Sequence, residues 1–250
     1  MALYRYIKFP SHTKKRIRMP LVSSLTLITM GLSILIWVGW PIISFSLFNQ
    51  YLFASTISPL AEQIDTVFGN PISPVVLAST GNVAGSRSRQ LSLENANLWF
   101  PTFPQKKVVT PVNSYRLSIP KLKISDATVI IAGDDLMKSL IHYGGTGLPG
   151  EYGNAIVFGH STLPQFYNPN DYRTIFSTVP TLKQGDDIFV VYDGITYRYQ
   201  VISLTVLQPN DLSGLEQRFD DSYLTLVTCV PPGTYWQRLY VKSRLIRPQT

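Results

Sequence analysis

The stretch Tyr223-Leu-Thr-Leu-Val-Thr-Cys229 is followed directly by Val230-Pro-Pro-Gly233. Its short run of apolar and β-branched residues predicts a strand that is at least half buried. Proline has no backbone N–H and cannot continue a central strand, so the strand must leave its sheet just after Cys229. We therefore expect the thiol to lie at a strand end, near the rim of the folded domain.

Six further segments have the same character and are separated by turn sequences such as Asp193-Gly194. Many short strands at this spacing predict a mainly β domain, either a closed barrel or a sandwich. Two segments, Asp134–Ile141 and Asp171–Pro180, read as short helices. The six other predicted strands are Tyr115–Ile119, Ala127–Ile131, Asn154–Phe158, Asp187–Tyr192, Thr196–Ile202 and Arg238–Arg244.

Residues 21–48 contain no Asp, Glu, Lys, Arg or His, and they are long enough to span a bilayer as one transmembrane helix. A cleaved signal peptide is the alternative, but its apolar part is usually only about 7–15 residues long. Six Lys and Arg residues and no acid lie within the basic tail, residues 1–20. The positive-inside rule therefore predicts a single-pass cell-membrane protein with a cytoplasmic amino terminus, and it places everything after the helix outside the cell.

The same tail accounts for the pI of 9.4. Without its six cations the chain has 16 Lys and Arg residues against 15 Asp and Glu residues. A nucleic-acid-binding protein needs a basic face on its folded domain, and this nearly neutral domain does not predict one. The tail is better explained as a topology signal that touches anionic lipid headgroups.

Residues 49–113 are rich in Pro, Ser, Gly, Asn and Thr and predict an extracellular linker between the helix and the domain of residues 114–250. Residues 60–68 could form a short helix within it. The aromatic run Leu98-Trp-Phe-Pro-Thr-Phe103 is too apolar for us to expect it to be exposed to water. It either packs against the outer wall of the domain or serves as a lid over a substrate groove, with Trp99 and Phe100 as the covering residues.

Cys229 is the only cysteine, so it cannot form a disulfide within the chain, and its value must lie in packing or in reactivity. Three features favour reactivity over an inert buried thiol: its place at a strand end, Arg238 and His160. Arg238 opens the next predicted strand, and a hairpin would bring its guanidinium beside the thiol, where a cation favours a thiolate or an oxyanion. An exposed arginine at a strand edge is the alternative.

His160 ends another predicted strand, in Ala155-Ile-Val-Phe-Gly-His160. A cysteine and a histidine that are distant in sequence but adjacent in the fold are the usual thiol nucleophile and acid/base partner. His142 competes for this role, although its place before a Gly-rich loop favours a structural histidine. His12 lies in the predicted cytoplasmic tail and is excluded.

Four segments in this order make the domain resemble the sortases, membrane-anchored cysteine transpeptidases of bacterial surfaces. The resemblance covers about residues 114–246 and implies a closed barrel of eight strands. The segments are His142-Tyr-Gly-Gly-Thr-Gly-Leu-Pro-Gly-Glu-Tyr-Gly-Asn154, Ala155–His160, Thr225–Cys229 and Arg238-Leu-Tyr-Val241.

The resemblance also implies the site and its reaction. Cys229 would be the nucleophile, His160 the general acid/base, Arg238 the stabiliser of oxyanion and substrate, and Thr228 a residue lining the groove. The substrate would be a surface protein with an LPXTG-like signal, cleaved between Thr and Gly through an acyl-thioester. The acyl group would pass to an amine, such as a cell-wall precursor or a pilin lysine, and neither metal nor cofactor is needed.

The short connection between Val230 and Gln237 is closer to class C, D or E sortases than to class A. Class C enzymes often carry an Asp-Pro-aromatic lid motif, and none occurs in residues 49–113, which weakens a function in pilin polymerisation. Two rivals remain for the function. One is a thiol hydrolase that only cleaves, and the other is an inactive membrane-tethered barrel used for binding.

Overall fold

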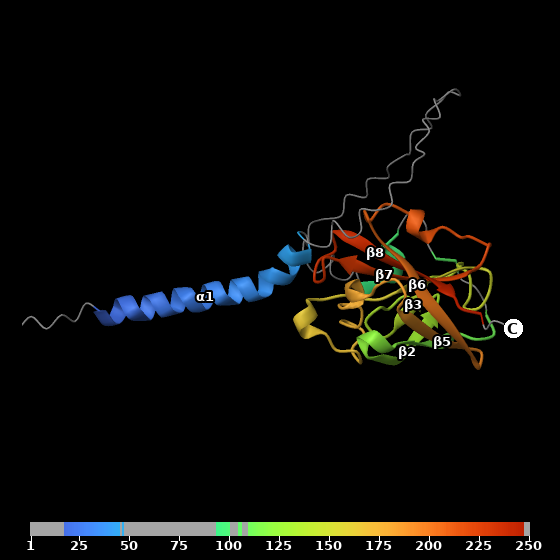
Figure 1. The fold of residues 1–250 in the computed structure, drawn as a ribbon, viewed down its shortest axis with the longest axis horizontal. Coiled ribbons are helices and arrows are strands. Elements are labelled where there is room, and N and C mark those ends of the chain that lie inside the picture. The colour runs from blue at the N-terminus through green and yellow to red at the C-terminus, as the bar shows by residue number, and fades with distance from the viewer. Residues whose placement is uncertain (1–17, 46, 48–93, 101–104, 107–109, 248–250) are drawn as a thin grey trace, which may run out of the picture. The chain divides into compact units, whose positions relative to one another are not determined.

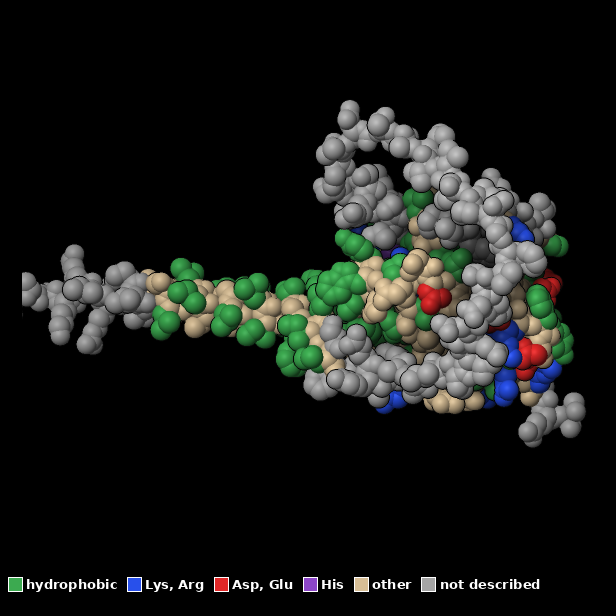
Figure 2. Space-filling model, turned by 90° about the horizontal axis from the view of Figure 1, so that it is seen from above, with side chains coloured by type: hydrophobic (Ala, Val, Ile, Leu, Met, Phe, Trp, Pro, Cys, Tyr) green, Lys and Arg blue, Asp and Glu red, His purple; other side chains and the backbone are tan. Residues whose placement is uncertain are grey.

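The computed structural model describes residues 18–45, 47, 94–100, 105–106 and 110–247. Residues 18–44 form the helix α1 (Arg18–Ser44), which continues past Pro41, and residues 23–44 are long and apolar enough to cross a membrane. The described side chains along this helix include no charged group (Figure 2). The expected linker, short helix and basic tail lie largely outside the described residues.

The described part of the remaining chain folds into one closed barrel of eight strands in the order β1-β2-β3-β4-β7-β8-β6-β5 (Figure 1). The barrel is therefore confirmed and the sandwich is excluded. Five short 3-10 turns decorate it: η2 (Ala96–Leu98), η3 (Pro120–Leu122), η4 (Pro164–Phe166), η5 (Val179–Thr181) and η6 (Ser213–Leu215). The strands are β1 (Ser114–Ile119), β2 (Ile124–Ile131), β3 (Leu140–His142), β4 (Gly153–Phe158), β5 (Asp187–Tyr192), β6 (Ile195–Leu207), β7 (Ser222–Val230) and β8 (Gln237–Leu245).

Every residue of β7 is buried, which is why its sequence is apolar on both faces. Leu224, Leu226 and Val230 point into the core of the barrel. Val227 and Cys229 belong to a second apolar cluster on the outer side of the wall, together with residues of the 96–100 segment and the β6–β7 connection. The second cluster is what places the thiol under a cover of protein instead of in open water.

The two helices expected from the sequence are wrong. Residues 134–141 form turns and then the strand β3, because Leu140 and Ile141 pair with β2 and β4 and are almost fully buried. The Asp135 side chain accepts the N–H of Met137 at 2.9 Å, which favours a turn over a helix. Residues 172–178 also form turns, and the segment ends in the short 3-10 helix η5, which begins at Val179.

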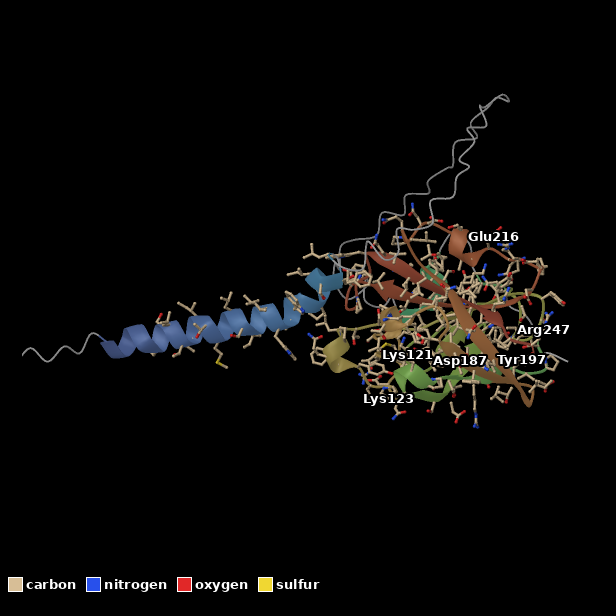
Figure 3. All side chains as sticks on the ribbon, viewed as in Figure 1. Lys121, Lys123, Asp187, Tyr197, Glu216 and Arg247 are labelled. Atoms are coloured by element: carbon tan, nitrogen blue, oxygen red, sulfur yellow. The ribbon has the colours of Figure 1, made fainter. Side chains whose placement is uncertain are left out.

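The labelled charged side chains Lys121, Asp187 and Arg247 lie on the outside of the barrel (Figure 3), whereas Arg238 is buried. Asp187 of β5 forms an ion pair with Arg198 of β6 at 2.9 Å, and Lys121 pairs with Asp186 at 2.6 Å. Acidic and basic side chains are neighbours on the visible face (Figure 2). Such exposed pairs contribute little to stability, about 0–1 kcal/mol each.

His142 on β3 is fully buried inside the wall, in the structural role expected for it. Its Nδ1 lies 2.9 Å from the Tyr115 hydroxyl, and its Nε2 lies 3.3 Å from the Thr146 hydroxyl. Burial lowers the pKa of His142 to about 4, and a hydrogen bond with the Thr146 backbone acts in the opposite direction. The imidazole is therefore neutral in the folded protein at pH 7.

We expect this histidine to make the fold sensitive to acid. The unfolded chain takes up a proton near pH 6.5, whereas the folded chain takes it up only near pH 4, so stability falls as the pH falls through this window. The loss is about 3 kcal/mol at pH 4 relative to pH 7. Denaturant unfolding at several pH values should show a smaller acid loss for His142→Asn than for the wild type, and equal losses would contradict the assignment.

Candidate active site

The strands β4 and β7 are parallel neighbours, with Phe158 of β4 opposite Val227 of β7. Parallel strands run in the same direction and end at the same rim of the barrel. His160 lies two residues after Phe158, and Cys229 lies two residues after Val227, so both lie at the same level just beyond the β4–β7 pairing. The sequence alone does not show that β4 and β7 are neighbours, because the two strand ends are far apart along the chain: Ser161, which follows His160, and Cys229 differ by 68 in residue number. The barrel topology brings the two predicted segments together.

Arg238 reaches the thiol through the β7–β8 hairpin, in which Cys229 and Arg238 are directly opposed partners. Arg238 Nη1 lies 3.4 Å from Cys229 Sγ and also donates to the backbone oxygens of Tyr235 and Gln237 at 3.3 and 3.4 Å. Its side chain is buried, and none of the salt bridges in the described part of the chain involves it. A buried cation without a carboxylate partner can stabilise an anion that forms beside it.

Burial keeps both reactive groups uncharged. Burial raises the pKa of the Cys229 thiol, and the nearby Arg238 cation opposes this rise. Burial also lowers the pKa of His160 to about 4, with the Asp135 carboxylate acting in the opposite direction. The site at pH 7 therefore contains a neutral thiol and a neutral imidazole next to a permanent positive charge.

The His160 ring nitrogen Nε2 is buried and has no hydrogen-bond partner among the described residues. Burying such a group without a partner costs about 1–3 kcal/mol, so it normally serves a purpose. The backbone oxygen of His160 is engaged, since it accepts the N–H of Phe176 at 3.0 Å. The ring nitrogen is thus available to a molecule that the structure does not contain.

Trp99 lies over these groups. Its ring stacks on Phe158 with centroids 5.3 Å apart, the Arg238 guanidinium carbon is 4.8 Å from its centre, and the His160 ring is 6.1 Å away. Phe100 packs beside it, 5.7 Å from Phe158. Trp99 and Phe100 therefore pack on the outer wall, which is one of the two interpretations expected, and they do so on the wall that carries the site. Residues 101–103 of the aromatic run lie outside the described residues.

Backbone bonds hold this segment in place. The Ala96 N–H donates to Asp134 O and the Leu136 N–H donates to Glu94 O, both at 3.0 Å. The Asn95 side chain caps η2 by accepting the N–H of Asn97 at 2.9 Å. Asp135, which acts on the pKa of His160, sits in the partner segment. The sequence gives no sign that Asp135 lies near His160, because Asp135 belongs to a segment for which we expected a helix.

Thr228 is fully buried, and its hydroxyl donates to the backbone oxygen of Gly159 at 2.9 Å. No atom of Thr228 is exposed in this conformation to meet a substrate, so the contact with substrate stays a prediction. In the structure this hydroxyl instead links the end of β7 to the end of β4. In the described part of the chain, no group of three His, Cys, Asp or Glu side chains could hold a metal ion.

Because Trp99 covers the site, we expect its removal to change the pKa and the alkylation rate of the Cys229 thiol. In Trp99→Ala, water enters, and the pKa of Cys229 should fall towards its ordinary value. One pKa unit is a tenfold change in thiolate, so we expect alkylation of Cys229 by iodoacetamide at pH 7 to be about tenfold faster or more. Leu98→Ala, which alters an exposed side chain in the same turn, is the control. An unchanged alkylation rate in Trp99→Ala would show that Trp99 does not shield the thiol.

Several known proteins are similar to this chain. The chain is 21% identical over 148 residues to Sortase D of Bacillus subtilis (strain 168), an alignment that covers 59% of this chain and 66% of that protein. Sortase C1 of Streptococcus agalactiae is similar in structure, with 29% identity, a TM-score of 0.49 and coverage of 57% of this chain and 72% of the other. Sortase C-1 of Actinomyces oris has 27% identity, a TM-score of 0.48 and coverage of 55% and 76%.

The model of the Sortase domain family matches residues 117–246, which is more than half of the chain and contains the whole barrel from β1 Leu117 onward. The match includes both parallel strand ends and the β7–β8 hairpin, so Cys229, His160 and Arg238 all fall within it. The chain belongs to the sortase family.

Proposed function

We propose that this sortase is a membrane-anchored cysteine transpeptidase that cleaves an LPXTG-like sorting signal between Thr and Gly. The observation that carries the proposal is the close pair of Cys229 and Arg238, with the thiol 3.4 Å from the buried guanidinium. The unpartnered Nε2 of His160 at the same rim supports it. These are the groups that acyl transfer through a thioester requires.

The chemistry starts from the neutral pair. As Cys229 Sγ attacks the Thr carbonyl carbon, the thiol proton passes to His160, and Arg238 donates to the oxyanion of the tetrahedral intermediate. The imidazolium then gives this proton to the departing glycine amine, and the C–N bond breaks to leave an acyl-thioester. An incoming amine attacks the thioester, loses its proton to His160, and the thiolate leaves and is reprotonated.

The proposed partners are supported by the family to which the chain belongs. We propose that the substrates are surface proteins with a carboxy-terminal sorting signal, and that the acceptor is an amine of a cell-wall precursor or a pilin lysine. The apolar helix α1 is consistent with a single-pass membrane anchor. We further propose that its amino terminus is cytoplasmic and that residues 114–250 act outside the cell.

The subclass is proposed as C-, D- or E-like. The connection between β7 and β8 is only six residues, 231–236. In this proposal residues 96–100 act as a lid that an incoming sorting signal displaces, because they occupy the apolar surface beside Cys229. The lid uses Trp99 where class C enzymes often carry an Asp-Pro-aromatic motif.

The test is incubation of the purified full chain with a set of sorting-signal peptides, with and without an added amine. We expect cleavage after Thr and, with amine, a ligated product. Cleavage that never captures the amine would establish a thiol hydrolase instead. If no peptide in the set is cleaved, the transpeptidase proposal is contradicted and a binding function is favoured.

A further inference from the structure

The ladder between β4 and β7 ends just before the two reactive residues. Its final strand pair is Phe158 opposite Val227, and the Gly159 N–H donates to Val227 O at 3.2 Å. After this point the His160 backbone turns away, since its oxygen accepts the N–H of Phe176 at 3.0 Å. Another contact must hold the departing segment close to Cys229.

Beyond the last backbone bond, two side-chain hydroxyls link the two strand ends. One bond runs from β7 to the end of β4, and the other runs from the segment after β4 back to β7. Thr228 Oγ1 donates to Gly159 O at 2.9 Å. Ser161 Oγ donates to Cys229 O at 2.7 Å. We call these two bonds the hydroxyl brace. They tie the residue before His160 to the residue before Cys229, and the residue after His160 to Cys229 itself.

The brace has a geometry that a single bond does not provide. Its two bonds flank His160 on both sides, so they limit the rotation of its backbone as well as its distance from Cys229. The bond of Ser161 has the usual length for a hydroxyl donor, 2.7 Å, and it reaches the residue that carries the thiol. Ser161 is half-buried and Thr228 is fully buried, so competition from water is weak.

We propose that Ser161 is a positioning residue that sets the separation of the His160 ring and the Cys229 thiol through this brace. The inference rests on the proposed function, because the separation matters only if a proton passes between them. A misplacement of about 1 Å can reduce a rate by about 10²-fold even when binding is intact. The Ser161 hydroxyl donates its hydrogen to the Cys229 backbone oxygen, so in this proposal it acts through Cys229 and not as a proton donor in the reaction.

The experiment compares three variants of the full chain. Ser161→Ala removes the bond to Cys229, whereas Ser161→Thr keeps a hydroxyl at the same place. Thr162→Val is the matched control, because the Thr162 hydroxyl lies 3.3 Å from Ser177 Oγ and is not bonded to β7. Each variant is assayed for kcat and KM with the sorting peptide and for its melting temperature.

We expect Ser161→Ala to lower kcat about 10–100-fold with KM changed less than about twofold, as lost positioning requires. Ser161→Thr should restore most of kcat, and Thr162→Val should leave it unchanged. The proposal is overturned if Ser161→Ala keeps wild-type kcat, if Thr does not rescue, or if Thr162→Val loses as much activity, which would indicate general loosening of the loop.

A second measurement separates failure of the brace from failure of the proposed function. Alkylation of Cys229 by iodoacetamide needs no peptide, and its pH midpoint reports the thiol in its place beside Arg238. We expect Ser161→Ala to shift this midpoint by about half a pH unit or more and Thr162→Val to leave it alone. If the wild type cleaves no peptide but this shift appears, the proposed function fails and the brace stands. An unshifted midpoint counts against the brace.

Discussion

Cys229→Ala is expected to abolish both cleavage and amine capture, with a loss in kcat of about 10⁴-fold or more, because no other group can form the acyl intermediate. The chain has one cysteine, so no second thiol can substitute. Alanine is slightly smaller than cysteine at this buried position, and the fold should survive with a small loss of stability. The rate is measured by separating the cleaved peptide from the intact peptide.

The control for this variant is its melting curve beside that of the wild type. A folded Cys229→Ala protein with no activity supports the assignment of the nucleophile. A folded variant that still cleaves the peptide would rule Cys229 out as the nucleophile and would require another residue to form the covalent bond.

Arg238→Ala is expected to have the next largest effect, a decrease in kcat of about 10²–10³-fold, because the donor to the oxyanion is removed. The cation also opposes the burial that raises the pKa of Cys229, so its loss should raise that pKa further. The alkylation profile of the thiol should therefore move to higher pH in the same variant. Kinetics and alkylation are measured on one preparation.

Arg238→Lys is the matched variant. Lysine keeps a positive charge near the thiol but not the flat guanidinium that lies 4.8 Å from the centre of the Trp99 ring. We expect it to recover the alkylation profile more fully than it recovers kcat. If Arg238→Ala kept the wild-type kcat, the proposed stabilisation of the oxyanion would be wrong.

The strands were well predicted because their residues carry a local signal. Strand β7 is apolar on both faces, and Val230-Pro-Pro-Gly233 marks its end. Strand β3 was missed because three residues, Leu140–His142, are too few to show a period of two, and they follow a turn that resembles a helix start. The closed order of the eight strands depends on distant pairings that no single segment encodes.

The candidate site divides in the same way. The position of Arg238 opposite Cys229 could be predicted, since a hairpin pairs residues that are close in sequence. The parallel pairing that aligns His160 with Cys229 required the complete barrel. The contact of Trp99 with Arg238 and the bond from Ser161 to Cys229 could not be predicted, because nothing in the sequence says which way these side chains point.

The central claim is that Cys229 carries an acyl group during turnover. Mass spectrometry of the full chain after reaction with a peptide and digestion tests this claim most directly. The protein is mixed with a cleavable sorting peptide without amine, quenched in acid and digested. The account predicts a mass increase equal to the peptide fragment that ends in Thr, located on the fragment containing Cys229 and removed by hydroxylamine. Cleavage of the peptide with no adduct, or with an adduct on another residue, would contradict it.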